Sequence, residues 1–241
     1  MVKIKILLSI FSLFVLTNNT SNSNAISVIY KIKVLKDNDR KDLDDKTKTT
    51  LSSINKALSE LEYVLYCNSK SSHYSINDKL AVEDGLAFKL AKKIAGSGIF
   101  YKDDSIKIKH KMSFGEKFNV VYPYKDNWII TKDTKIINGY KCYKATTVRE
   151  EKNYYKDTYQ KFFPEVWFAP EIPYQFGPRG LDGLPGLVLE GTINGKTIFY
   201  ASTIKFDCDD CLQKIIKPKA KKEILKDDYN KLMAEIRKEQ E

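Results

Sequence analysis

Four cysteines are the residues of this 241-residue chain that are best suited to covalent chemistry. Two of them frame a pair of acids in Cys208-Asp209-Asp210-Cys211, the spacing of thiol–disulfide exchange motifs. The two carboxylates would raise the pKa of both thiols, whereas redox chemistry needs a thiolate. We therefore expect structural disulfides: either Cys208 pairs with Cys211, or both pair with Cys67 and Cys142, since four cysteines allow three connectivities.

Carboxylates come next, because two of them placed on either side of a bond can act as general acid and base. Adjacent acids such as Asp209 and Asp210 would point to opposite faces of a strand, which makes them poor candidates. Glu165, Glu171 and Glu190 lie near a glycine-rich segment and could meet in the fold, although their spacing does not require it. They support an alternative function, a secreted hydrolase.

The other residues that often do chemistry carry no pattern. His73 and His110 fall in separate strand-like segments, with no HExxH spacing and no neighbouring cysteine. The sequence therefore contains no metal site of ordinary spacing. Ser97 in AGSGIF does not match GxSxG, the motif of a nucleophile elbow. We expect no catalytic residue, no metal and no cofactor.

Aromatic residues are dense in NYYKDTYQKFFPEVWF. Such density can line an apolar groove or form a docking patch for a protein partner. More commonly, aromatic residues in strands pack a sheet against its helices. The candidate ligand or partner surface consists of Tyr154, Tyr155, Tyr159, Phe162, Phe163 and Phe168.

The N-terminus indicates where these residues must work. Residues 1–25 have two early lysines, an apolar run from Ile4 to Leu16 and small residues before Ala25, which is the pattern of a cleaved signal peptide. We expect an exported mature chain without an integral membrane segment. The net charge of +10 comes mainly from lysine, a poor reader of bases and phosphates, so we expect no nucleic-acid partner.

Hydrophobic periodicity predicts the elements that position these residues. Alternating segments predict strands at 26–35 and 61–68, and four more in the span 98–137. Spacings of three and four predict helices near residue 50, from Asn77 to Gly96, and at about 218–240. Two Asn-Gly dipeptides, at 138–139 and 194–195, predict tight hairpins and hence an antiparallel sheet. The expected fold is one α+β domain, residues 26–241, with two or three helices on a mainly antiparallel sheet.

The glycine-rich segment GPRGLDGLPGLVLEG is predicted to have a structural role. Pro185-Gly186 is typical of the centre of a type II turn leading into a strand, Leu187 to Ile193. A two-residue loop at Asn194-Gly195 would pair position 193 with 196 and Gly191 with Ile198. A phosphate-binding loop is excluded, because the glycines precede a strand and GxxxxGK[ST] is missing.

The string GLPGLV resembles the signature of the GLPGLI family, exported Bacteroidetes proteins, with Val188 where the family name has isoleucine. Two earlier blocks resemble the family in order: Trp128 to Ala145, and Trp167 to Pro178. The stretch from Thr146 to Val166 is longer than is usual in the family, so a site there would be particular to this chain. The matching residues expected to define the fold are Trp128, Gly139, Cys142, Trp167, Gly177, Pro178, Gly183, Leu184, Pro185, Gly186, Leu187 and Val188.

This resemblance implies no catalytic residue, because the family has no established activity. By analogy it implies a sheet that curves into an open half-barrel. It also implies a location in the periplasm or cell envelope of a Gram-negative bacterium. We expect a non-enzymatic envelope protein that binds an apolar ligand or an envelope or outer-membrane protein partner, with the secreted hydrolase as the alternative.

Overall fold

The structure is a computed structural model that describes residues 25–35, 44–77, 85–123 and 125–240. Residues 1–24 of the predicted leader lie outside the described residues. The elements are β1 (Ile26–Val34), α1 (Asp45–Glu60), β2 (Glu62–Cys67), β3 (Ser72–Ile76), α2 (Leu86–Ala95), β4 (Ile99–Lys102), β5 (Lys107–Ser113), β6 (Glu116–Val121), β7 (Ile129–Ile137), β8 (Tyr140–Thr146), β9 (Arg149–Asn153), β10 (Thr158–Phe162), β11 (Glu165–Ala169), η2 (Pro178–Gly180), β12 (Leu187–Thr192), β13 (Thr197–Lys205), η3 (Asp209–Lys214), β14 (Lys222–Leu225) and α3 (Lys226–Lys238).

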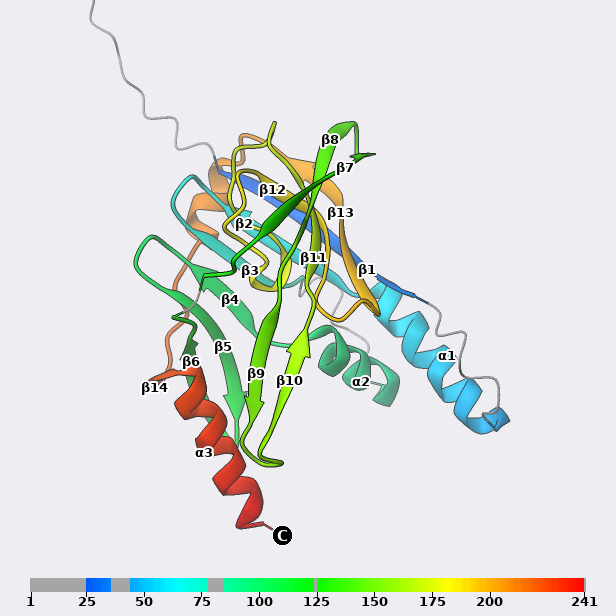
Figure 1. Cartoon of the computed structure of the whole chain (residues 1–241), viewed down its shortest axis with the longest axis vertical. Helices are drawn as coiled ribbons and strands as arrows, with labels where there is room; N and C mark the ends of the chain where they lie inside the picture. The colour runs from blue at the N-terminus through cyan, green and yellow to red at the C-terminus, as the bar shows by residue number, and fades with distance from the viewer. Residues whose placement is uncertain (1–24, 36–43, 78–84, 124, 241) are drawn as a thin grey trace, which may run out of the picture.

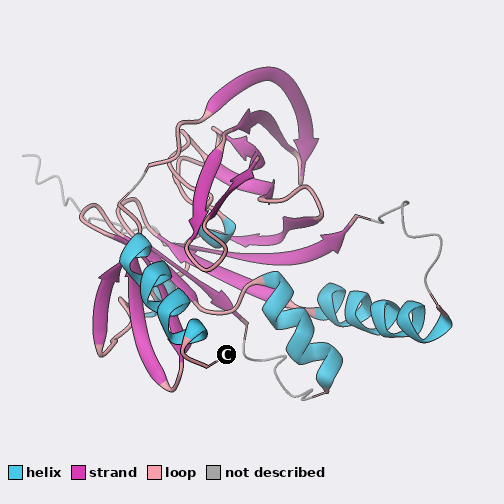
Figure 2. Ribbon diagram, turned by 60° about the horizontal axis from the view of Figure 1, so that its bottom comes forward, coloured by secondary structure: helices cyan, strands magenta, loops and turns pink. Residues whose placement is uncertain are grey.

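Twelve of these strands form one twisted sheet, in the order β14-β6-β5-β4-β3-β2-β1-β13-β12-β11-β8-β7 (Figures 1 and 2). The sheet stays open, with β14 and β7 as its two edges. Strands β9 and β10 form a separate hairpin. Every pairing of the described strands is antiparallel except that of β14 with β6. The predicted α+β class with a mainly antiparallel sheet is confirmed.

The Asn138-Gly139 hairpin forms as predicted. Both residues have positive φ, 51° and 85°, and Ile137 pairs with Tyr140 across a two-residue loop. This is the geometry of a type I′ turn, whose twist matches that of the flanking strands.

The second Asn-Gly hairpin has a different register from the predicted one. Gly191 pairs with Phe199, not with Ile198, and four residues separate β12 from β13. The Asn194 side chain accepts the N–H groups of Lys196 and Thr197, which builds a wider loop. The one-residue shift places the Phe199 ring in the core and leaves Ile198 and Tyr200 only half-buried.

Two of the three predicted helices begin later than expected. Asn77 directly follows β3, and its backbone N–H donates to the Glu62 carbonyl of β2. The described helix α2 starts at Leu86, after Gly85, and residues 78–84 lie outside the described residues. At the C-terminus, α3 starts at Lys226, because the preceding four residues form β14 beside β6. Helix α1 agrees with the prediction near residue 50.

The main core lies on one face of β1, β2 and β3. Tyr30, Tyr63 and Tyr74 are each at most 2% exposed, and the rings of Tyr63 and Tyr74 stack with centroids 5.3 Å apart. Helices α1 and α2 contribute Leu58 and Phe88 to the same core. Within the described ranges, no helix is both long and apolar enough to cross a bilayer.

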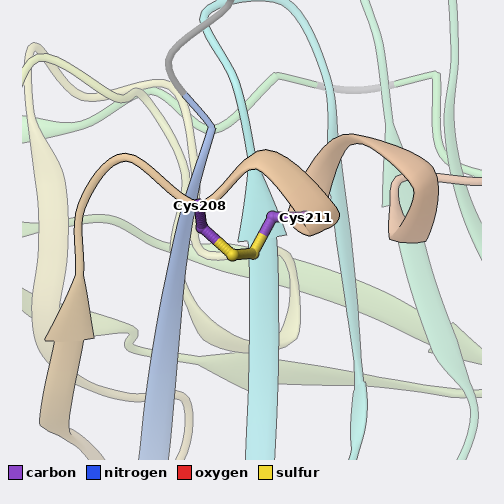
Figure 3. The surroundings of a disulfide bond; sticks show 2 residues. All are labelled: Cys208 and Cys211. Atoms are coloured by element: carbon purple, nitrogen blue, oxygen red, sulfur yellow. A yellow bond between two sulfur atoms is a disulfide. The ribbon is translucent and has the colours of Figure 1, made fainter.

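A disulfide joins Cys208 to Cys211, the local pairing among the predicted alternatives (Figure 3). Cys67 and Cys142 are buried and free, so they take no part in a bridge. The disulfide packs with Ala25, the last residue of the predicted leader, whose carbonyl accepts the Cys208 N–H at 3.0 Å. A disulfide is consistent with an exported protein.

Candidate functional site

The GLPGLV motif is a packing device in the fold. A Cβ on Gly186 would stand 2.3 Å from the Ala169 carbonyl oxygen, and one on Gly177 would stand 2.6 Å from the Val188 Cβ. The predicted type II turn is wrong: the Gly186 N–H donates to the Leu184 carbonyl at 2.8 Å, which closes a three-residue turn around Pro185. Gly183 has φ 90° and leads into this turn.

The apolar residues of the motif bury themselves in two neighbouring clusters. Leu187 belongs to the main core, while Leu184 and Val188 join Phe168 in a second cluster behind β11. The remaining motif residues support this region. Trp128 donates from Nε1 to the Asp182 carbonyl, Cys142 is fully buried on β8, and the half-buried Trp167 ring carries Lys135 Nζ at 4.3 Å from its centroid.

The predicted aromatic surface is not one surface. Phe168 is buried in the core, 2% exposed, and Phe162 is half-buried. Tyr159 and Phe163 are exposed, at 66% and 65%. Tyr154 and Tyr155, in the turn of the β9–β10 hairpin, lie against α3 instead.

A groove of about 270 Å³ runs between this hairpin and α3. The two elements lie side by side in Figure 1. Cations cover the faces of its two tyrosines, with Arg237 4.6 Å from the Tyr155 ring centroid and Lys152 5.2 Å from that of Tyr154. The groove is lined by Glu151, Lys152, Asn153, Tyr154, Tyr155, Gln160, Asn230, Met233, Ala234 and Arg237.

The three glutamates of the hydrolase hypothesis take different roles in the fold. Glu190 accepts from Lys135 Nζ at 2.6 Å, and Glu165 pairs with Lys144 Nζ at 2.9 Å. Glu171 is exposed in the turn after β11. The two paired carboxylates are therefore bound to lysines on the face of the sheet that carries Trp167, and neither pairs with the other.

A half-buried cationic cluster that the sequence does not predict lies where η2 covers β4 and β5. We call it the cation cluster: Lys102, Lys107, Lys109, Arg149 and Arg179, with the acids Asp126 and Asp182. Asp182 accepts from Lys102 at 2.7 Å and pairs with Lys107 at 2.9 Å. Asp126 binds Arg149 through two hydrogen bonds of 2.7 and 2.5 Å. Five cations thus face two acids.

The η2 turn holds Arg179 inside this cluster. Arg179 and Gly180 both have left-handed backbones, with φ 54° and 72°, and the Leu181 N–H donates to the Pro178 carbonyl. Lys107 and Arg149 donate to the Gly180 carbonyl at 2.9 and 3.4 Å, which fixes the turn from below. A left-handed non-glycine residue costs on the order of 1 kcal/mol, so the surrounding contacts must impose the conformation.

Arg179 finds aromatic and backbone neighbours, and no carboxylate pairs with it in the described part of the chain. Its guanidinium carbon lies 5.4 Å from the Phe199 ring centroid, and the group packs on Gly96. Its Nε is buried and has no hydrogen-bond partner there; the same holds for the Tyr74 hydroxyl. Burial lowers the pKa of Arg179, and the nearby Tyr74 and Tyr63 phenols partly oppose this shift by raising it.

Lys109 is the second cation of the cluster that forms no ion pair with a described residue. Its Nζ lies 5.0 Å from the Phe100 ring centroid. Burial lowers the pKa of Lys109 to about 8, and the charge of Arg179 adds to that shift. The lysine therefore loses its proton far more readily than an exposed one.

A faint sequence signal for this cluster exists. Lys107 and Lys109 alternate with Ile106 and Ile108 in a strand, and two of the four arginines of a lysine-rich chain are Arg149 and Arg179. Arginine is the cation suited to bidentate contacts with carboxylates and phosphates. In a chain with so few arginines, their positions are therefore candidates for anion contacts. The sequence does not show that these segments meet.

Comparisons with known proteins agree on fold and give no activity. A sequence model described as a protein of unknown function (Porph_ging) matches residues 128–190. Two crystal forms of PNGF-II match with TM-scores of 0.54 and 0.52, both at 15% identity, over 88% and 83% of this chain. These matches cover 32% and 31% of the PNGF-II chains, so the chain spans less than a third of their length. At this identity the likeness shows the fold alone. A search of curated proteins found no match.

Proposed function

We propose that the chain is a non-enzymatic binding protein of the cell envelope, and that the groove between β9–β10 and α3 holds an acidic, extended segment of an envelope protein. The observation that carries this proposal is the groove itself, about 270 Å³ in volume and lined by two of the predicted aromatic residues. Its position on the long 146–166 segment fits a partner particular to this chain.

The lining supports a protein partner over an apolar ligand. Met233 and Ala234 provide a small apolar floor, whereas most of the lining is amide, hydroxyl or charged. Lys152 forms an ion pair with Asp157 at 3.0 Å, and the acid of the groove, Glu151, is bound to Lys226, so Arg237 is the positive charge left over from this set. An acidic segment would therefore meet a complementary potential, which favours the correct partner and faster association.

Site-specific photo-crosslinking tests this proposal in cells that make the protein. A photoreactive residue in place of Asn230, which lines the groove, is expected to trap one envelope protein, and Arg237→Glu in the same chain should abolish that product. A matched probe at Tyr159, exposed outside the groove, should trap none of it. Equal products from both positions, or no effect of Arg237→Glu, would contradict the groove as the binding surface.

The absence of catalysis is tested separately. Glu171→Ala and Glu190→Ala should have no effect on any hydrolysis detected across a panel of ester, peptide and glycoside substrates. A loss of such activity in both variants would favour the hydrolase.

A further inference from the structure

We propose that the cation cluster under the η2 turn binds a small oxyanion of the phosphate or carboxylate type, with Arg179 and Lys109 as its charged ligands. This site is separate from the groove of the proposed function and does not depend on it.

The first argument is the uncompensated charge. Lys102, Lys107 and Arg149 each contact a carboxylate of Asp126 or Asp182. Arg179 and Lys109 contact none in the described part of the chain, although both side chains are half-buried against aromatic rings. A buried charge costs several kcal/mol unless it is paired, and the two here also repel each other. A bound anion would supply the missing counter-charge for both.

The second argument is the set of unused hydrogen-bond donors. The Arg179 Nε–H and the Tyr74 O–H are buried without a partner among the described residues. A continuous chain of ring contacts joins the two groups: the Arg179 guanidinium carbon lies 5.4 Å from the Phe199 ring centroid, Phe199 lies 5.9 Å from Tyr63, and Tyr63 stacks on Tyr74. Buried donors are almost always satisfied in folded proteins, so two neighbouring exceptions point to an absent acceptor.

The third argument is access from solvent. Arg179 and Lys109 are half-buried, so the cluster keeps a path to solvent.

The fourth argument is the way the turn is built. Arg179 occupies a left-handed backbone position at which glycine would be unstrained, and Lys107 and Arg149 clamp the next carbonyl. Strained, over-determined residues of this kind gather at ligand sites. Glycine would serve the turn alone, whereas arginine serves an anion.

Isothermal titration of the full-length mature protein with inorganic phosphate and with acetate, at constant ionic strength and pH 7, tests the proposal. We expect saturable binding of at least one of them, weakened about tenfold or more by Arg179→Gln and by Lys109→Met, the effect of losing one charged contact. Tighter binding of phosphate would identify a dianion site, and tighter binding of acetate a carboxylate site.

Two controls separate this site from the groove and from misfolding. Arg237→Gln removes an arginine from the groove and should leave anion binding unchanged. Circular dichroism shows whether Arg179→Gln folds; if it does not, Lys109→Met decides. The proposal is overturned if the wild type binds neither anion saturably, if Lys109→Met binds as tightly as the wild type, or if Arg237→Gln causes the same loss.

Discussion

At the residue scale, the GLPGLV motif depends on the absence of a Cβ atom at Gly186. Gly186 lets β12 begin directly against the backbone of Ala169 and Pro170, and no side chain of any size fits between them. A leucine on either side of the turn is buried because of this approach.

Gly186→Val is therefore expected to destabilise the protein by roughly 3 kcal/mol or more, since backbone cannot yield as a flexible side chain can. Urea unfolding followed by tryptophan fluorescence measures the loss, and an insoluble product counts as the same outcome. Gly85→Ala is the matched control, because nothing lies within 4 Å of its Cβ position. A Gly186→Val protein as stable as this control would contradict the close approach.

Lys109 predicts an unusual pH dependence of stability. Its pKa is about 8 in the folded protein and about 10.4 when unfolded, so between these values the unfolded state binds more protons. The free energy of unfolding should therefore rise from pH 8 to pH 10, by roughly 1–3 kcal/mol. Above pH 10 it should fall, because burial raises the pKa of Tyr63 and of Tyr122 to about 12 in the folded state.

Urea denaturation at pH 7.5, 9, 10 and 11 measures both the rise and the later fall. In Lys109→Met the rise should disappear while the fall above pH 10 remains. A rise of equal size in this variant would assign the slope to another group.

At the element scale, the sequence predicts strands and hairpins well where the information is local. Asn138-Gly139 forms the expected turn because both residues need positive φ and both are suited to it. Asn194-Gly195 differs because the Asn194 side chain takes two backbone N–H groups, and Thr192 Oγ1 takes that of Gly195. The dipeptide alone does not choose between these turns.

The cation cluster escapes prediction for another reason. Its cations come from β4, β5, β9 and η2, which are far apart in the sequence. Only the folded sheet, with η2 packed on it, brings them together. The groove also depends on the position of α3, since four of its ten lining residues come from that helix and the other six from β9, β10 and the turn between them.

Helix α3 should be held by one residue above all. Tyr229 is 4% exposed, meets the Phe118 ring edge-on and shares a 2.6 Å hydrogen bond with Ser113. Tyr229→Ala should therefore release α3 from the sheet, at a cost of roughly 3 kcal/mol or more. Hydrogen exchange by mass spectrometry should show lost protection in 226–238 while β1 and β2 stay protected. Leu225→Ala, 50% exposed, is the control; protection that persists in Tyr229→Ala would contradict this anchor.

At the scale of the whole molecule, the four cysteines divide into two pairs with different chemistry. Burial raises the pKa of Cys142 to about 11 and that of Cys67 still further, so neither thiol is reactive in the folded chain. Iodoacetamide should leave the native protein unmodified, and unfolding without a reductant should expose two thiols. Four should react once a reductant is added. Intact mass spectrometry counts the additions, and four additions without reductant would contradict the Cys208–Cys211 bridge.

The parallel pairing of β14 with β6 has a consequence for how the chain is made. The outer edge of β6 is completed only by residues 222–225, which leave the ribosome long after β6 itself. Until then, an unpaired strand edge is available to any neighbouring chain, and such edges template aggregation. The C-terminal segment replaces the edge of β6 by the short, four-residue edge of β14. A chain that ends before residue 222 is therefore expected to aggregate more readily than the whole chain.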